Sequence, residues 1–134
     1  MKLTSGIIIG LGVAVAIIFI VESIGHALFP APAGLVLSSV SGIHVGEEGL
    51  PLGMQITDVL AWTLGIFGGG LVGGIVAGRR AIISWIVAPI ILCLAALSFG
   101  RLPYEEWLVQ AALGLIFVAA GLASYYAREL PNLR

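Results

Sequence analysis

The apolar residues of this chain fall in four long runs, and polar residues are nearly confined to the breaks between the runs. About 20 apolar residues in a helix, rising 1.5 Å per residue, cross the ~30 Å hydrocarbon core of a bilayer. Each run is close to that length, so the pattern predicts an all-α fold of four membrane-spanning helices. The predicted spans cover about residues 5–29, 54–78, 81–99 and 104–127.

The breaks between the runs differ in length and predict how the helices are connected. Pro30 ends the first run, because proline cannot continue the backbone hydrogen-bond ladder. The connection 30–53 is the one long outer loop, and its apolar pieces predict a segment that lies on the membrane surface or folds back over the helix ends. Only Arg79 and Arg80 separate the second and third runs, so these two helices must form an antiparallel hairpin.

Composition supports a membrane protein and excludes other classes. The 134 residues are 60% hydrophobic and 10% charged, with a mean hydropathy of +1.15, whereas soluble domains average roughly 25% charged residues. No basic stripe suits nucleic acid. A short basic start before an apolar run also fits a signal peptide, but this run is long and carries Glu22 near its end, which favours an uncleaved helix. Residues 1–134 are therefore expected to form a single four-span membrane domain in the lipid bilayer.

The basic residues are unevenly distributed over the predicted connections, and this predicts an orientation. With four spans, both termini and the break at 79–80 lie on one side of the membrane. Basic residues concentrate on the cytoplasmic side of membrane proteins. We therefore predict an N-in, C-in topology, because only Arg101 falls on the opposite side. The basic residues on the predicted cytoplasmic side are Lys2, Arg79, Arg80, Arg128 and Arg134.

The second span carries glycines at a spacing that lets helices pack closely. In lipid, helices associate through close backbone contact, which small residues four positions apart permit. We expect tight packing within the bundle, with a homo-oligomer contact as the alternative. Glycine-rich loops also bind phosphate, but no Gly-Lys-Ser/Thr follows and this run lies inside the membrane, so no nucleotide site is predicted. The predicted packing positions are Gly65, Gly69, Gly70, Gly73, Gly74 and Gly78.

Four polar residues inside the predicted spans form the candidate site. Glu22 and His26 are four positions apart and therefore lie on one face of the first helix. Asp58 lies near the outer start of the second span, and Gln110 lies about 9 Å below the outer start of the fourth. The topology gives these groups a common depth, so they can converge. Ionisable groups inside membrane helices are costly and usually face a protein interior or a wet cavity.

Three interpretations of this group remain open. In the first, Glu22 pairs with His26 or Arg101 and locks the bundle. In the second, Glu22, His26 and Asp58 form a proton or cation site at the mouth of a pathway. In the third, the same three residues carry out chemistry or bind a divalent metal, for which imidazole and carboxylates are suitable ligands. The spacing Glu-x-x-x-His is not the zincin motif His-Glu-x-x-His, and no cofactor is clearly implied, so an enzyme is the less favoured class.

A motif at the end of the first span carries a family resemblance. Residues 22–34 read Glu-x-x-Gly-His-x-x-Phe-Pro-x-Pro-x-Gly, followed by Leu-Pro-Leu-Gly at 50–53, Ala-Trp at 61–62 and the glycine run. The chain resembles a group of small bacterial four-span inner-membrane proteins of uncharacterised function. The resemblance covers the first half of the chain and implies a bacterial inner membrane, without implying an activity. Small multidrug transporters also have four spans and a first-span glutamate, but they are shorter and lack the large loop.

These observations favour the transport or permeation of a small solute or cation. In this hypothesis Glu22 is the proton- or cation-responsive carboxylate, His26 is its partner, and Asp58 is a third ligand or gate. The alternative is an accessory or scaffold subunit that binds partner membrane helices and has no activity of its own. The two hypotheses differ in one observable, because transport needs a wet route to Glu22 whereas a scaffold can bury it dry.

Overall fold

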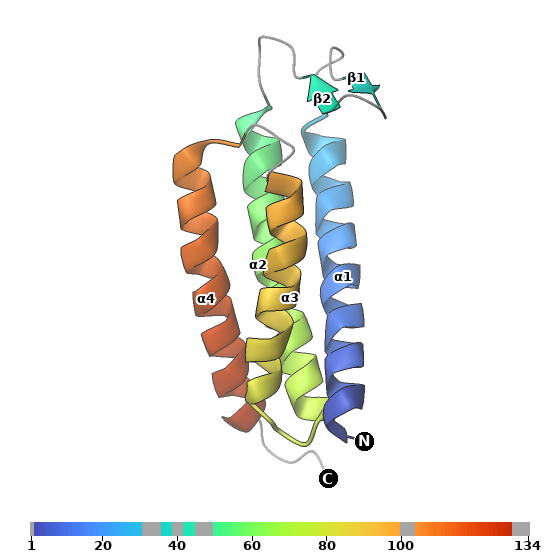
Figure 1. The fold of residues 1–134 in the computed structure, drawn as a ribbon, viewed down its shortest axis with the longest axis vertical. Helices are drawn as coiled ribbons and strands as arrows, with labels where there is room; N and C mark the ends of the chain where they lie inside the picture. Colours follow the sequence, from blue (N-terminus) through green and yellow to red (C-terminus); the bar gives the residue numbers. More distant parts are fainter. Residues whose placement is uncertain (1, 31–35, 39–41, 45–49, 100–103, 130–134) are drawn as a thin grey trace.

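Four helices make up most of the computed structural model, which describes residues 2–30, 36–38, 42–44, 50–99 and 104–129 (Figure 1). The predicted four-helix fold is confirmed, and each helix end lies within three residues of the predicted span. The helices are α1 (Lys2–Leu28), α2 (Leu52–Val76), α3 (Ile82–Phe99) and α4 (Glu106–Glu129).

Three of the helices, α1, α2 and α4, are long and apolar enough to cross a membrane, and α3 is a shorter apolar helix. Large apolar side chains cover the outside of the bundle as well as its interior. Phe19 on α1 and Phe117 on α4 are exposed, for example, while Ile66 and Ile91 are fully buried. Helices that are apolar on all sides are typical of membrane spans.

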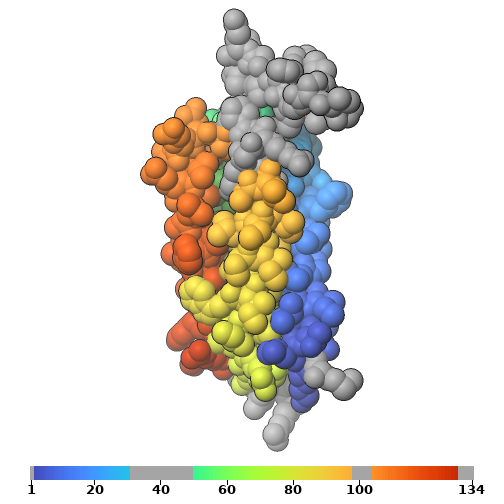
Figure 2. Space-filling view, in the orientation of Figure 1, coloured from blue at the N-terminus to red at the C-terminus, as the bar shows by residue number. Residues whose placement is uncertain are grey.

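The central helix of the bundle is α2, which packs against all three of the others. Among the described residues, α1 and α4 do not contact each other; they lie on opposite sides of α2 (Figure 1). The third helix, α3, contacts α1, α2 and α4, and in the view of Figure 2 it covers most of α2 together with its two neighbours. Residues of α1 and α4 therefore meet only by way of α2 or α3.

A seam of small residues joins α1 to α2 along most of their length. A Cβ built at Gly10 would lie 2.7 Å from the carbonyl oxygen of Gly69, and one at Gly73 would lie 2.6 Å from that of Gly6. Ala14, one turn beyond Gly10, is fully buried, and a Cβ at Gly69 would lie 2.6 Å from its Cβ. The two backbones therefore touch directly, as the glycine spacing predicts for helices in lipid.

The remaining predicted packing glycines have other neighbours. Gly70 lies against Ser84 of α3 and Ala123 of α4, and Gly74 lies against Ala127 of α4. The prediction for Gly78 is wrong, because a Cβ at this position would meet nothing within 4 Å. Gly78 follows the end of α2 with φ +81°, a left-handed conformation that glycine adopts without steric cost and that turns the chain toward α3.

The long connection predicted at 30–53 contains two short strands. Two short strands, β1 (Val36–Ser38) and β2 (Gly42–His44), pair antiparallel with Leu37 opposite Ile43. The strands include Leu37 and Ile43 from the apolar pieces of this loop. This small sheet lies beyond the ends of α1 and α2 that carry the candidate site (Figure 1).

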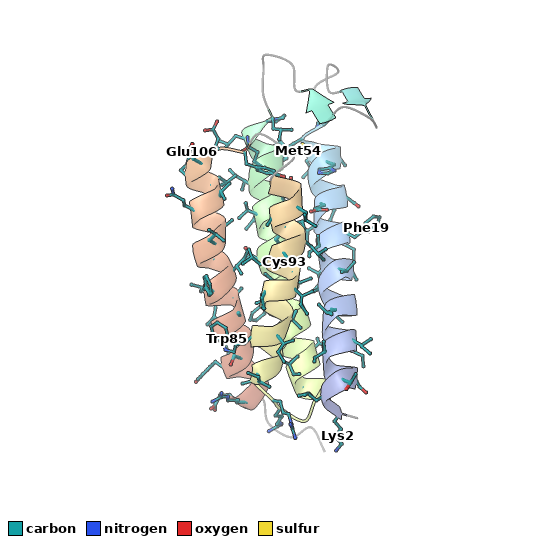
Figure 3. All side chains as sticks on the ribbon, in the orientation of Figure 1. Lys2, Phe19, Met54, Trp85, Cys93 and Glu106 are labelled. Carbon is teal, nitrogen blue, oxygen red and sulfur yellow. The ribbon has the colours of Figure 1, made fainter. Side chains whose placement is uncertain are left out.

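Charged side chains are sorted between the two ends of the bundle. Lys2 lies at one end, and Glu106 and Met54 lie at the other (Figure 3). The turn from α2 to α3, which contains Arg79, is at the same end as Lys2 (Figure 1). The start of α1 and the end of α4 thus share the basic end of the molecule.

Candidate functional site

A buried carboxylate, that of Asp58 on α2, is the centre of the polar cluster. Asp58 is 4% exposed, and its Oδ2 accepts a 2.7 Å hydrogen bond from the Tyr104 hydroxyl just before α4. Its Oδ1 lies 3.4 Å from Nε2 of His26 on α1. This Oδ1 is also buried and accepts no hydrogen bond within the described part of the chain. Three segments far apart in sequence therefore meet at one carboxyl group.

The His26 side chain connects this carboxylate to the outside of the bundle. It is 49% exposed, whereas the Asp58 side chain is only 6% exposed. An imidazole can exchange a proton on either ring nitrogen and is a common metal and proton ligand. A proton or small cation that reaches His26 from outside is thus one contact away from a buried negative group.

Close packing of α1 on α2 brings His26 within reach of Asp58. A Cβ at Gly25 would overlap the Thr57 side chain, so only glycine permits this approach. One turn further along, a Cβ at Gly53 would lie 2.5 Å from the ring of Phe29. The residues preceding His26 and Asp58 are thus in direct contact, which places the two functional side chains opposite each other.

Glu22 faces the same part of α2, one turn below His26. Its carboxylate is half-buried, is hydrogen-bonded to Trp62 and lies within electrostatic range of both Asp58 and His26. Glu22 therefore points toward α2 and not away from the bundle. The predicted convergence of Glu22, His26 and Asp58 from α1 and α2 is present in the structure.

Gln55 connects the first turn of α2 to the segment just before α4. This side chain is 3% exposed, and its Nε2 donates to the carbonyl oxygen of Leu50 at 3.0 Å. Its Oε1 accepts a 3.0 Å hydrogen bond from the backbone N–H of Glu105. Because Glu105 follows Tyr104 directly, this bridge fixes the segment that carries the Tyr104 hydroxyl to Asp58. Both the NH2 group and the carbonyl oxygen of the Gln55 side chain therefore bind backbone groups, so Gln55 is a positioning residue.

Gln110 does not belong to the cluster, and its inclusion in the predicted site is corrected. The side chain is exposed, whereas Leu108 and Ala112 are buried. Side chains two positions apart on a helix point in directions that differ by about 200°. Gln110 therefore points away from the face that packs on α2. Its depth fits the cluster, but its direction does not.

A metal centre built from the candidate residues is not supported. Among the described residues, no group of three or more His, Cys, Asp or Glu side chains is arranged to hold a metal ion. The predicted pairing of Glu22 with His26 also needs correction. His26 contacts Asp58, and Glu22 is hydrogen-bonded to Trp62. The alternative partner, Arg101, lies outside the described residues.

The electrostatic environment of the cluster is dominated by its two carboxyl groups. Tyr104 lies just before α4, outside the three helices that are long and apolar enough to cross a membrane. Burial raises the pKa of Tyr104, and the hydrogen bond to Asp58 and the negative charges of Asp58 and Glu22 raise it further. Tyr104 therefore stays a neutral donor to Asp58 in any ordinary condition. The arrangement can hold a proton or a cation, but it contains no activated nucleophile.

Tyr104, Gln55 and Trp62 were not among the predicted site residues. Tyr104 and Gln55 lie at the same depth as Asp58 in the predicted spans, so their depth could have indicated them from the sequence. The pairing of each side chain depends on the rotation of α2 and on the path of the chain into α4, which depth does not specify. Trp62 was recognised only as part of the Ala-Trp motif and proves to contact the first-span glutamate.

Comparison with known proteins adds no relative to this picture. No protein-family model, no curated protein and no solved structure matches the chain.

Proposed function

We propose that this chain is a small multi-pass protein of the bacterial inner membrane that serves the transport or permeation of a cation or small solute. In this proposal the His26–Asp58 pair is its proton- or cation-binding site, and Glu22 sets the local charge. One observation carries the proposal: a buried carboxylate has one oxygen held by Tyr104 and the other facing a half-exposed imidazole. Ionisable residues in membrane helices usually mark ion pathways or proton relays.

The route to the site supports this class of function. His26 is exposed in the last turn of α1, at the end of this helix opposite Lys2, so a ligand can reach it without crossing the apolar core. From there Asp58 is the next polar group inward, and Glu22 follows one turn further along α1. Two carboxyl groups at successive depths provide a stepwise path for a positive charge.

The proposed orientation puts this site on the outer side, with both termini in the cytoplasm. Basic residues at the Lys2 end support it through the positive-inside rule. The test uses Lys2→Cys and Glu106→Cys in a Cys93→Ser background. A membrane-impermeant maleimide applied to spheroplasts should label only the second variant, and the first only after the membrane is opened. The reverse result would contradict the orientation.

The functional test is ion flux through purified protein in liposomes. Asp58→Asn removes the buried negative charge with little change of shape, and Glu106→Gln, at an exposed position of the same end, is the matched control. We expect proton or monovalent-cation flux in the wild type and in Glu106→Gln, and a loss of at least tenfold in Asp58→Asn. Absence of flux from the wild type under proton and cation gradients would overturn the proposal.

One observation favours the accessory-subunit alternative. Below the cluster the centre of the bundle is filled by fully buried apolar side chains such as Ile66, Ile91 and Ile116. In addition, α1 leaves most of its apolar surface uncovered, including Phe19. If liposomes show no flux, a photocrosslinking residue in place of Phe19 tests this alternative in cells. A discrete crosslinked product that is lost when the residue is moved to buried Ile18 would support helix-to-helix association.

A further inference from the structure

An apolar groove of about 170 Å³ lies between α3 and α4, on the part of the bundle away from the His26–Asp58 pair. Its floor is formed by Ala88 and Ile116, which are buried at the contact of the two helices. Its walls are larger side chains that remain partly or largely exposed, namely Trp85, Pro89, Leu92 and Phe117. The groove therefore opens toward the membrane and not toward the interior of the bundle.

Next to the groove, toward the basic end of the molecule, α4 has an open position at Gly121. Gly121 lies one turn beyond Phe117 on α4, and a Cβ built there would meet nothing within 4 Å. Arg128 lies eleven residues beyond Phe117, which places the two side chains within about 20° of each other around the helix and about 16 Å apart along it. This length is close to half of the ~30 Å hydrocarbon core of a bilayer.

Positive charge lies beyond Gly121, near the ends of both helices. Arg128 is in the last turn of α4, and Arg80 lies two residues before the start of α3, where its carbonyl oxygen accepts a hydrogen bond from the N–H of Ile83. Both side chains are exposed, and neither has an ion-pair partner among the residues that the structure describes. The first turn of α3 contains no acidic residue, so the positive end of its helix dipole adds to this field.

We propose that this groove binds an anionic phospholipid of the surrounding bilayer, with one acyl chain between α3 and α4 and its phosphate between Arg80 and Arg128. Arginine suits this role, because its planar guanidinium binds phosphate oxygens in a bidentate manner. Trp85 supports the same depth, since tryptophan prefers the level of lipid headgroups. The site is independent of the His26–Asp58 pair and does not require that the protein transports an ion.

The test compares lipids and variants in purified full-length protein. The unfolding midpoint in a mild neutral detergent is measured while phosphatidylglycerol or phosphatidylcholine is added, and native mass spectrometry counts the lipids that stay bound. We expect phosphatidylglycerol to raise the midpoint by several degrees more than phosphatidylcholine. The double variant Arg80→Gln with Arg128→Gln should lose this difference. The matched control, Lys2→Gln with Arg79→Gln, removes the same charge at the same end and should keep it.

A second pair of variants tests the acyl-chain part of the site. Gly121→Leu places a side chain at the open position between Phe117 and Arg128, and it should reduce the count of bound phosphatidylglycerol. Gly12→Leu on α1, where a Cβ also meets nothing within 4 Å, is the control and should not reduce it. Equal effects of the two lipids on the wild type would overturn the proposal. So would full lipid binding by Gly121→Leu, because surface attraction to the arginines would then account for the preference.

Discussion

Gly25 of α1 lies so close to the side chain of Thr57 of α2 that a Cβ at residue 25 would overlap it. This contact lies beside the His26–Asp58 pair and sets the separation of the two helices at the candidate site. A glycine in the motif Glu-x-x-Gly-His thus has a mechanical role. It allows the histidine that follows to face the aspartate that follows Thr57.

The first prediction tests this contact with the smallest substitution that fills the space. Gly25→Ala should destabilise the protein by about 1–3 kcal/mol, the usual effect of overpacking, although alanine favours a helix over glycine by about 1 kcal/mol. The control is Gly12→Ala, which meets open space and should be neutral or slightly stabilising. Thermal unfolding in detergent measures both variants. Equal midpoints for the two would show that α1 moves freely at residue 25.

The second prediction concerns the seam of small residues farther along the same two helices. A Cβ at Gly69 would be in conflict with the backbone of Gly10 and the side chain of Ala14. Backbone atoms cannot move aside as side chains do, so Gly69→Leu should force α1 away from α2 and cost about 3 kcal/mol or more. Gly114→Leu on α4, an exposed position with no neighbour within 4 Å, is the control for hydrophobicity and helix propensity. The comparison is made from unfolding midpoints and from the elution volume in detergent.

Helix lengths and the seam were predictable because each depends on local composition. Long apolar runs determine the helices, and glycines four positions apart determine where backbones touch, as Gly10 and Gly69 do. The meeting of His26 and Asp58 was predictable in part. The spans give the two residues a common depth, and this makes their contact possible without specifying it.

Rotation about a helix axis was not predictable in α4, and Gln110 illustrates why. The buried face of this helix consists mainly of small residues, including Ala112, Ala119 and Ala123, while Leu113 and Phe117 face outward. Burial in α4 therefore follows small size and not hydrophobicity, as is common for helices in lipid. The periodicity of hydrophobic residues therefore does not show which face of such a helix packs on its neighbours. The positions of the alanines do show it, and they place Gln110 on the opposite face.

The third prediction follows from the raised pKa of Tyr104 and concerns alkaline pH. In the unfolded chain this phenol titrates at about pH 10, while in the folded protein burial and then Asp58 raise its pKa. Above about pH 10 the unfolded state therefore binds fewer protons than the folded state, and stability falls as the pH rises. The contribution is fully present below about pH 10.

Tyr104→Phe provides the measurement for this pH dependence. The variant loses the hydrogen bond to Asp58 and should be less stable at neutral pH by about 1–3 kcal/mol. Its stability should, however, decline less steeply than that of the wild type above about pH 10. Tyr126→Phe, on the exposed part of α4, is the control and should keep the wild-type slope. Parallel curves for wild type and Tyr104→Phe would exclude Tyr104 as the group responsible.

The last prediction distinguishes a structural role of the His26–Asp58 pair from a functional one by a double-mutant cycle. His26→Asn leaves the buried Oδ1 of Asp58 without the imidazole that faces it, and Asp58→Asn leaves His26 without its carboxylate. Each single variant should lose about 1–3 kcal/mol of stability. The double variant should lose less than the sum of the two, with a coupling of about 0.5–3 kcal/mol, because the residues are in contact. A coupling near zero would mean that the two side chains do not interact in the folded protein. The control is Ile66→Ala, which destabilises the bundle through a buried apolar side chain away from the pair. If the double variant regains stability but shows no ion flux in liposomes, while Ile66→Ala keeps its flux, the pair acts in function and not only in holding α1 against α2.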